Sequence, residues 1–212
     1  MILYGSSFSP YVRKTLAYLA EKGLTADLKP VRFQDQDPAF REASPFGKMP
    51  GFSDGDFAIS DSTAIITYLE AKHPEPPLLP TEPRARARTI WYEEFADTIL
   101  IATMGKVFFN RVVSPKFLGR EGDLALADMA AKDEYPPLVD YVETIIPDSG
   151  FLVEDRLTLA DLAVASPFVN FAHCGIHIDA ARNPKTAAYV EGILSRPSFA
   201  GVVAGEKAFL AR

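Results

Sequence analysis

The sequence has little cysteine, no long apolar run and no excess of positive charge. A single cysteine, Cys174, in 212 residues excludes an internal disulfide and is typical of a reducing compartment. The best apolar stretch, Ile99–Phe109, is interrupted by Lys106 and is shorter than the roughly 18 residues of a membrane-spanning helix. The net charge of −6 argues against nucleic acid as a partner, because phosphate binding needs a basic field. The start, Met1–Tyr4, resembles a strand and not a signal peptide, so we expect a cytoplasmic protein without membrane contact.

What the sequence does contain is the composition of a folded globular protein. Hydrophobic residues make up 48% of it and charged residues 24%, which excludes disorder as a description of the whole chain. Five prolines between His73 and Pro83 predict a stiff, extended linker. We therefore expect a first domain over residues 1–76, a proline-rich linker over 77–83 and a second domain over 84–212.

The part of the chain before the linker alternates strand and helix signals. The predicted order is a strand at 1–4, a helix at 11–22, a strand at 27–33, a loop with a short helical turn at 35–42, a hairpin of strands at 51–53 and 57–59, and a helix that begins after Ser60. The hairpin prediction depends on Asp54-Gly55, a strong two-residue turn signal. This order is that of an α/β thioredoxin-like fold.

Beyond the linker, helical periodicity dominates and predicts an all-α domain. The predicted helices lie at 84–112, 123–146, 159–171, 184–194 and 201–210. Pro136-Pro137 and Pro167 are expected to break or kink their helices. Thr158 and Asp161 form a variant capping box before the third of these helices, which is apolar nearly all round and is therefore expected to be buried.

Ser9 is the first candidate for chemistry. It follows the turn Gly5–Ser7 and precedes Pro10, which predicts a helix N-cap and a first helical residue. A helix N-terminus offers unpaired N–H groups and the positive end of a dipole, so an anion placed there is stabilised. A helix cap and nothing more is the alternative interpretation of Ser9, and the residues leave both roles open. The tetrad that Ser9 opens, Ser-Pro-Tyr-Val, resembles the Cys-Pro-Tyr-Cys of glutaredoxins without the thiols, so a nucleophilic thiolate has to come from a ligand.

Two further turns carry candidate binding groups. Gly47 and Pro50 permit an irregular turn with an unpaired backbone edge, to which an extended peptide can add as a strand. Asp61 and Ser62 lie at a predicted helix N-terminus, where free N–H groups suit a carboxylate. A tight structural turn and a partner for the helix dipole are the alternative interpretations, and both stay open.

A metal site and a catalytic triad are weaker hypotheses. His173-Cys174-x-x-His177 contains residue types that bind zinc, but Gly175 interrupts the helix and no fourth ligand is nearby in the sequence. We therefore expect no metal. None of the three histidines has an identifiable acid partner, so no Ser/His/Asp arrangement can be argued.

These motifs together resemble the cytosolic glutathione transferase superfamily, in a serine-type, bacterial-like form, over essentially the whole chain. The motifs are Ser9-Pro10-Tyr11, Gly47-Lys48-Met49-Pro50, Asp61-Ser62, Ile65-Ile66-x-Tyr68-Leu69, the proline-rich linker, Thr158-Leu-Ala-Asp161 and Arg196-Pro-Ser-Phe199. No single motif decides the matter, but their common order and spacing argue against chance.

The resemblance implies glutathione as a co-substrate. In serine-type members, the residue matching Ser9 donates a hydrogen bond to the glutathione sulfur. The proline matching Pro50 is cis and lets the backbone of the residue before it, Met49, pair with the cysteinyl part. The residues matching Asp61 and Ser62 hold the γ-glutamyl ammonium and carboxylate.

The chain departs from the family at the glycyl end of glutathione. Lys48 could reach the glycyl carboxylate. Members often carry a basic or amide side chain in the preceding loop, where this chain has Asp35-Gln36-Asp37, so only Gln36 is chemically suited. The two acids beside Gln36 disfavour an anionic ligand and so bear on the affinity for glutathione more than on its binding mode.

Two other hydroxyls compete with Ser9. Some serine-type classes place the active serine slightly earlier in the turn, which makes Ser6 and Ser7 alternatives. We favour Ser9 because it stands directly before Pro10.

The resemblance also implies an apolar electrophile pocket. The residues expected to line it are Phe8, Tyr11, Met104, Phe108 and Arg111. For those of the helical domain, packing in the core or at a dimer interface is the alternative.

We therefore expect a glutathione S-transferase that activates the thiol for attack on an apolar electrophile, a chemistry typical of detoxification. An isomerase, dehalogenase or thiol lyase would use the same thiolate. A non-catalytic scaffold of the same fold is the alternative from another class, which the acidic loop favours and the intact Ser9, Pro50 and Asp61-Ser62 set disfavours. A two-fold homodimer is implied, with the long helix that begins at Arg84 at the interface.

Overall fold

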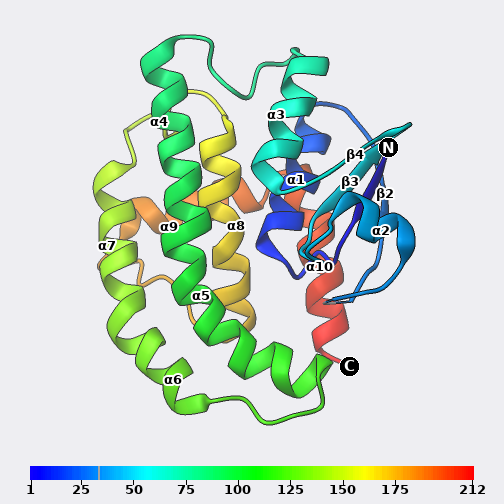
Figure 1. Ribbon diagram of the computed structural model, residues 1–212. Helices are drawn as coiled ribbons and strands as arrows, with labels where there is room; N and C mark the ends of the chain where they lie inside the picture. Colours follow the sequence, from blue (N-terminus) through cyan, green and yellow to red (C-terminus); the bar gives the residue numbers. More distant parts are fainter. Residues whose placement is uncertain (33) are drawn as a thin grey trace. The chain divides into compact units, whose positions relative to one another are not determined.

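The computed structural model describes residues 1–32 and 34–212 and divides into two compact units. The first unit combines Met1–Leu79 with Pro197–Arg212, and the second is Pro80–Arg196 (Figure 1). The division near the prolines resembles the predicted one, but the last sixteen residues pack with the first unit and not with the helical region. A buried ion pair between Arg13 and Glu206, whose side chains are each 1% exposed, joins this segment to α1 (Pro10–Glu21).

The first unit contains a mixed four-stranded sheet (Figure 1). Its strands are β1 (Ile2–Tyr4), β2 (Asp27–Lys29), β3 (Gly51–Asp54) and β4 (Phe57–Ser60), in the spatial order β2-β1-β3-β4. β1 is parallel to β2 and antiparallel to β3, as expected when a helix connects the first pair and a hairpin the last. The predicted α/β thioredoxin-like fold is confirmed.

Helices α1 (Pro10–Glu21), α2 (Pro38–Ala43), α3 (Ser62–Lys72) and α10 (Pro197–Leu210) complete this unit. The stretch expected to be a loop with a helical turn is the helix α2, because Asp37 accepts the Phe40 N–H at 2.9 Å and Pro38 takes its first position. The strand predicted at 27–33 already ends at Lys29, and Phe33 lies outside the described residues.

The start of the proline-rich segment is fastened to the first unit by Glu70. One carboxylate oxygen of Glu70 accepts the N–H groups of Leu78 and Leu79 at 3.0 and 3.1 Å. The other lies 2.7 Å from the ammonium of Lys22 and accepts the Tyr18 hydroxyl. The residues up to Leu79 therefore belong to the first unit because buried polar groups of α1 and α3 need them as partners.

The second unit is helical in all of its regular structure except one isolated bridge between Val153 and Arg156. Its helices are α4 (Pro83–Glu94), α5 (Ile101–Phe108), α6 (Leu124–Met129), α7 (Tyr135–Ile145), α8 (Leu159–His173) and α9 (Pro184–Leu194), with π-helical segments at Phe95–Leu100, Phe109–Phe117 and Ala130–Glu134. In the part of the chain that the structure describes, no helix is long and apolar enough to cross a membrane.

Prolines explain two of the three π-helical segments. Pro115 lies inside the second, and Pro136 and Pro137 follow the third after one residue, Tyr135. A proline lacks an N–H and crowds the carbonyl four residues earlier, which a widened helical turn relieves. The helix predicted at 84–112 is a continuous run of α4, α5 and the first two π-helical segments. It extends to Phe117 instead of stopping at Val112.

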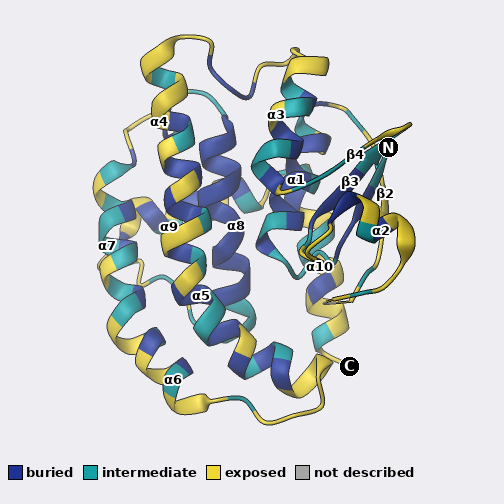
Figure 2. Ribbon diagram, viewed as in Figure 1, coloured by how far each residue is buried: buried dark blue, intermediate teal, exposed yellow. Residues whose placement is uncertain are grey.

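Helix α8 is the buried centre of the second unit, with every residue from Leu159 to Phe171 buried (Figure 2). The predicted capping box forms at its start: the Asp161 carboxylate accepts the N–H of Thr158 at 2.8 Å and its hydroxyl at 3.2 Å. The other carboxylate oxygen accepts the Leu152 N–H and the Tyr189 hydroxyl. One side chain thus joins α8, α9 and the loop before α8.

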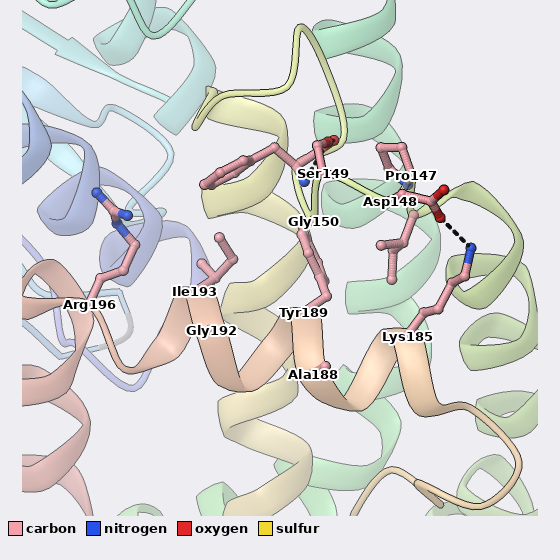
Figure 3. Close-up of a pocket in the computed structure, with 12 residues that line it drawn as sticks. Pro147, Asp148, Ser149, Gly150, Lys185, Ala188, Tyr189, Gly192, Ile193 and Arg196 are labelled. Atoms are coloured by element: carbon pink, nitrogen blue, oxygen red, sulfur yellow. Dashed lines mark hydrogen bonds and ion pairs between the residues drawn. The ribbon is translucent and has the colours of Figure 1, made fainter.

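A hollow of about 440 Å³ lies between the loop Ile146–Phe151 and α9 (Figure 3). It exists because Ala188 and Gly192, one turn apart on α9, bring little side chain to this face. At its rim, the Lys185 ammonium lies 3.5 Å from the Asp148 carboxylate, so these two charges offset each other.

We expect Asp161→Asn to lower the free energy of unfolding by about 2–4 kcal/mol, because an amide cannot accept all four hydrogen bonds and leaves a buried N–H without a partner. Urea unfolding followed by circular dichroism measures this change. Asp155→Asn is the control, since Asp155 is exposed in the preceding loop. An equal effect of the two substitutions would contradict the assigned role.

Candidate functional site

The register of the sheet gathers the candidate site segments at one end. Tyr4 is paired with Lys29 on one side and with Gly51 on the other, and Gly51 is paired with Ser60. β1, β2 and β4 end at this row of four residues, and β3 begins there. The Ser9 turn, the Met49–Pro50 turn and Asp61-Ser62 directly continue the central and outer strands, so backbone pairing alone brings these three predicted segments to the same end of the sheet.

Ser9 is the N-cap of α1, as predicted. Its backbone is extended, with φ −75° and ψ 124°, and its hydroxyl oxygen accepts the N–H of Val12 at 3.5 Å. Its carbonyl accepts the Arg13 N–H at 2.9 Å, while its own N–H donates to the carbonyl of Ser6. The hydroxyl proton of Ser9 has no acceptor among the described residues, so it can be donated to a ligand. Ser6 and Ser7 lie in the same turn, half-buried, but neither caps the helix.

The turn before β3 presents unpaired backbone. The peptide bond between Met49 and Pro50 is cis, as the resemblance implied. Within the described residues, neither the N–H nor the carbonyl of Met49 has a hydrogen-bond partner. An extended peptide can pair with such an exposed edge. Ser44 fixes the turn, because its hydroxyl accepts the Lys48 N–H and donates to the Lys48 carbonyl.

Asp61 and Ser62 open α3, and both carry unused polar groups. Asp61 has φ +80° and caps the helix through one carboxylate oxygen, which accepts the N–H groups of Thr63 and Ala64. Its other oxygen has no partner in the part of the chain that is described. The Ser62 hydroxyl is also without a partner there, although Ser62 is only 2% exposed. Asp61 is therefore a cap, as the structural interpretation held, and still offers an acceptor to a cation.

The acidic loop before this turn uses its carboxylates on its own backbone. Asp35 accepts the N–H groups of Arg32 and Asp37, which lowers the pKa of its carboxyl group. Asp37 caps α2. Gln36, the predicted ligand of the glycyl carboxylate, instead donates to the carbonyl of Gln34 at 2.7 Å and is exposed.

Sequence reasoning missed one cation near this loop, Arg41, which lies in the helix α2 that follows it. The short helix α2 brings its guanidinium to the carbonyl of Pro45 at 3.2 Å and to the side chain of Gln34 at 3.3 Å. The same guanidinium lies against Gly47, whose φ of +64° and lack of a side chain make room for it. The signal was the Asp37-Pro38 start of α2, which places Arg41 in the last turn. Lys48 is exposed, and its ammonium has no ion-pair partner within the described ranges.

The predicted electrophile pocket draws on both units, so each part is described by itself. Phe8 and Tyr11 of the first unit are half-buried. In the second unit, Met104 and Phe108 are buried. Arg111 lies 2.7 Å from Asp128 and donates to the carbonyl of Cys174. The pocket itself stays a prediction.

Matches to known proteins cover most of the chain. Residues 3–77 match the family described as glutathione S-transferase, N-terminal domain, and residues 108–204 match the corresponding C-terminal domain. A glutathione S-transferase of Hyoscyamus muticus is 30% identical over 96% of this chain and 97% of its own length. The chain belongs to the glutathione S-transferase family.

Two further relatives show the range of the family. A stringent starvation protein A homolog of Coxiella burnetii is 26% identical over 94% of this chain and 89% of its own. The solved structure of a glutathione S-transferase from Methylobacterium radiotolerans, in complex with glutathione sulfonate, is 28% identical with a TM-score of 0.76. It covers 95% of this chain and 93% of its own.

Cys174, the one thiol of this transferase, is half-buried, and burial raises its pKa to about 11. A thiol with such a pKa is almost entirely protonated at neutral pH and is a poor nucleophile. No group of three or more histidine, cysteine or acidic residues that could hold a metal occurs within the described residues.

We expect iodoacetamide to alkylate native Cys174 at pH 8 roughly 100-fold more slowly than an ordinary thiol of pKa about 8.5, because its thiolate fraction is that much smaller. The rate should rise with pH up to about 11, where the thiol titrates. Mass spectrometry measures the rate, and the same protein in urea is the control. Similar native and unfolded rates would contradict the raised pKa.

Proposed function

We propose that this glutathione S-transferase binds glutathione at the row of strand ends and stabilises its thiolate through Ser9. The observation that carries the proposal is a set of polar groups without partners among the described residues. They are the Met49 backbone, the Ser62 hydroxyl, the free oxygen of Asp61 and the Lys48 ammonium. Burial under a ligand would be costly for each of these groups unless the ligand provided a partner.

Each group suits one part of the tripeptide. The Met49 backbone would pair with the cysteinyl residue in the manner of an added strand. Asp61 would accept from the γ-glutamyl ammonium, and the Ser62 hydroxyl and the N-terminus of α3 would hold its carboxylate. Lys48 would attract the glycyl carboxylate, in place of the predicted Gln36, whose side chain is engaged with Gln34.

The chemical step would depend on the Ser9 hydroxyl. An ordinary thiol with a pKa near 8.5 is only a few per cent thiolate at neutral pH. A hydrogen bond from Ser9 and the N-terminal dipole of α1 both favour the anion over the neutral thiol and so lower its pKa. The thiolate sulfur would then attack an apolar electrophile, forming a carbon–sulfur bond and expelling the leaving group. The capping position of Ser9 supports it over Ser6 and Ser7.

A non-catalytic role is the second candidate. One relative of similar coverage carries the name stringent starvation protein A homolog and not that of a transferase. The acidic loop argues for this role less than its sequence suggested, because Asp35 and Asp37 bind backbone N–H groups. Retention on immobilised glutathione would separate the candidates.

We also propose a homodimer. Each unit exposes a large aromatic side chain, Phe46 with 80% and Trp91 with 51% of its surface exposed. Trp91 lies on α4, in the long helix expected at the interface, together with the exposed Arg84 and Arg88. Burial of such side chains against a second copy is favourable.

Ser9→Ala should lower the glutathione-dependent rate roughly 10- to 100-fold, since it removes one charge-assisted hydrogen bond and leaves the helix dipole. The pKa of bound glutathione, read from the ultraviolet absorbance of the thiolate, should rise by about one to two units. Ser7→Ala is the matched control. If Ser7→Ala or Ser6→Ala shifts both values and Ser9→Ala does not, the assignment is wrong.

Asp61→Asn should weaken glutathione binding by about 1–3 kcal/mol, the range for a hydrogen bond to a charged group. The amide keeps the oxygen that caps α3, so stability should change little. Titration calorimetry measures the affinity, and Asp56→Asn in the exposed hairpin turn is the control. An unchanged dissociation constant for Asp61→Asn would refute its role.

A further inference from the structure

The helix that ends the chain, α10, runs antiparallel along α1 in the first unit (Figure 1). At one end the Ser198 hydroxyl donates to Glu21 at 2.6 Å. Glu206, eight residues after Ser198 on α10, forms an ion pair with Arg13, eight residues before Glu21 on α1. Three residues further, Phe209 contacts Phe8, with ring centroids 5.5 Å apart in an edge arrangement.

Two of these contacts bracket Ser9. The Arg13 guanidinium donates to both carboxylate oxygens of Glu206, at 3.1 and 2.8 Å, inside the unit. The backbone N–H of the same Arg13 donates to the carbonyl of Ser9 at 2.9 Å. On the other side of Ser9, the ring of Phe8 is held by Phe209. Glu206 and Phe209 are three residues apart and therefore lie on one face of α10.

A bidentate, buried pair restricts orientation more than a single contact does, because both planar groups must stay aligned. Fixing Arg13 fixes the first hydrogen bond of α1, and with it the direction in which the cap residue presents its hydroxyl. An isolated helix end would fray at this position.

We propose that α10 positions Ser9 for thiol activation, with Glu206 and Phe209 as positioning residues. This inference rests on the proposed role of Ser9 in binding the glutathione sulfur. Neither residue touches the substrate in this proposal. Phe209 acts through Phe8, which precedes Ser9 in the turn. Glu206 acts through Arg13, whose backbone N–H donates to the Ser9 carbonyl.

The first test is Phe209→Ala, which removes a side chain that is 50% exposed and so should leave the fold intact. We expect kcat with glutathione and a model aryl halide to fall about 3- to 10-fold, because small misplacements of a reacting group are costly. The thiol pKa of bound glutathione should rise, and KM for glutathione should change less than kcat. Ser198→Ala is the matched control, since it removes an α1–α10 contact at the far end of α1.

The second test is the double substitution Arg13→Met with Glu206→Leu, because either single change leaves a buried charge without its partner. Apolar side chains of similar volume should keep the protein folded, as thermal unfolding will report. We expect the folded double variant to show the raised thiol pKa and lowered kcat of Phe209→Ala. Wild-type pKa and kcat in both variants, or an equal loss in Ser198→Ala, would overturn the positioning role.

Amide hydrogen exchange separates this inference from the proposed function. If Glu206 and Phe209 position the cap, the Val12 N–H, which Ser9 accepts, should exchange faster in both variants than in wild type and Ser198→Ala. If Val12 exchanges faster in both variants, but the thiol of glutathione bound to the wild-type protein has the pKa of free glutathione, then α10 positions the cap and Ser9 does not activate the thiol. Unchanged exchange at Val12 in both variants would overturn the inference even where Ser9→Ala abolishes activity.

Discussion

Backbone pairing across the row Lys29, Tyr4, Gly51 and Ser60 is the constraint on which the rest of the site depends. Side chains alternate between the faces of a sheet, so a strand that slipped by one residue in this register would turn its buried side chains to the opposite face. Such a slip would also move the Ser9 turn away from the Met49–Pro50 turn. Phe52 and Leu3, paired in the neighbouring row and both fully buried, fix the register through the core. The site is thus a consequence of strand pairing, with the loops adding the chemistry.

Helix α1 is held by buried charge at both ends. Arg13 meets Glu206 in its first half, and Lys22 meets Glu70 near its end, with each of the two cationic side chains at most 1% exposed. Buried pairs of this kind lose much of their attraction to the desolvation of the two ions, so they add less to stability than to the choice of one geometry. In this transferase, the two pairs fix the orientation of α1, the helix whose N-terminus carries the candidate thiol-activating hydroxyl of Ser9.

The candidate site includes a helix N-terminus, which favours an anion, and a hydroxyl in place of a thiol of its own. Ser9, and not a cysteine, caps the N-terminus of α1, while burial raises the pKa of Cys174 to about 11. Several polar groups serve two purposes at once. Asp61 caps α3 with one carboxylate oxygen and leaves the other open. Asp35 and Asp37 order their own loop, while Lys48, next to Met49 in the turn, is exposed. In the proposed function, this division would let an acidic loop and an anionic ligand share one end of the sheet.

The sequence by itself predicted the four strands, one of them longer than it is, the caps at Ser9 and Thr158, the helix start at Asp61-Ser62 and the three candidate segments of the first unit. Such signals are local, because a turn or a cap depends on residues a few positions apart. The roles of the site residues remain predictions. Only the tertiary structure decided that Gln36 turns to Gln34, that Arg41 lies against Gly47 and that α10 belongs with α1. The contacts of Gln36 and Arg41 with Gln34 span only two and seven residues, but they follow from the irregular path of the loop, for which the sequence has no periodic signal. The place of α10 depends on partners far along the chain, Arg13 and Glu206, which no local pattern relates. Their pairing follows from the burial of two opposite charges once the helices pack.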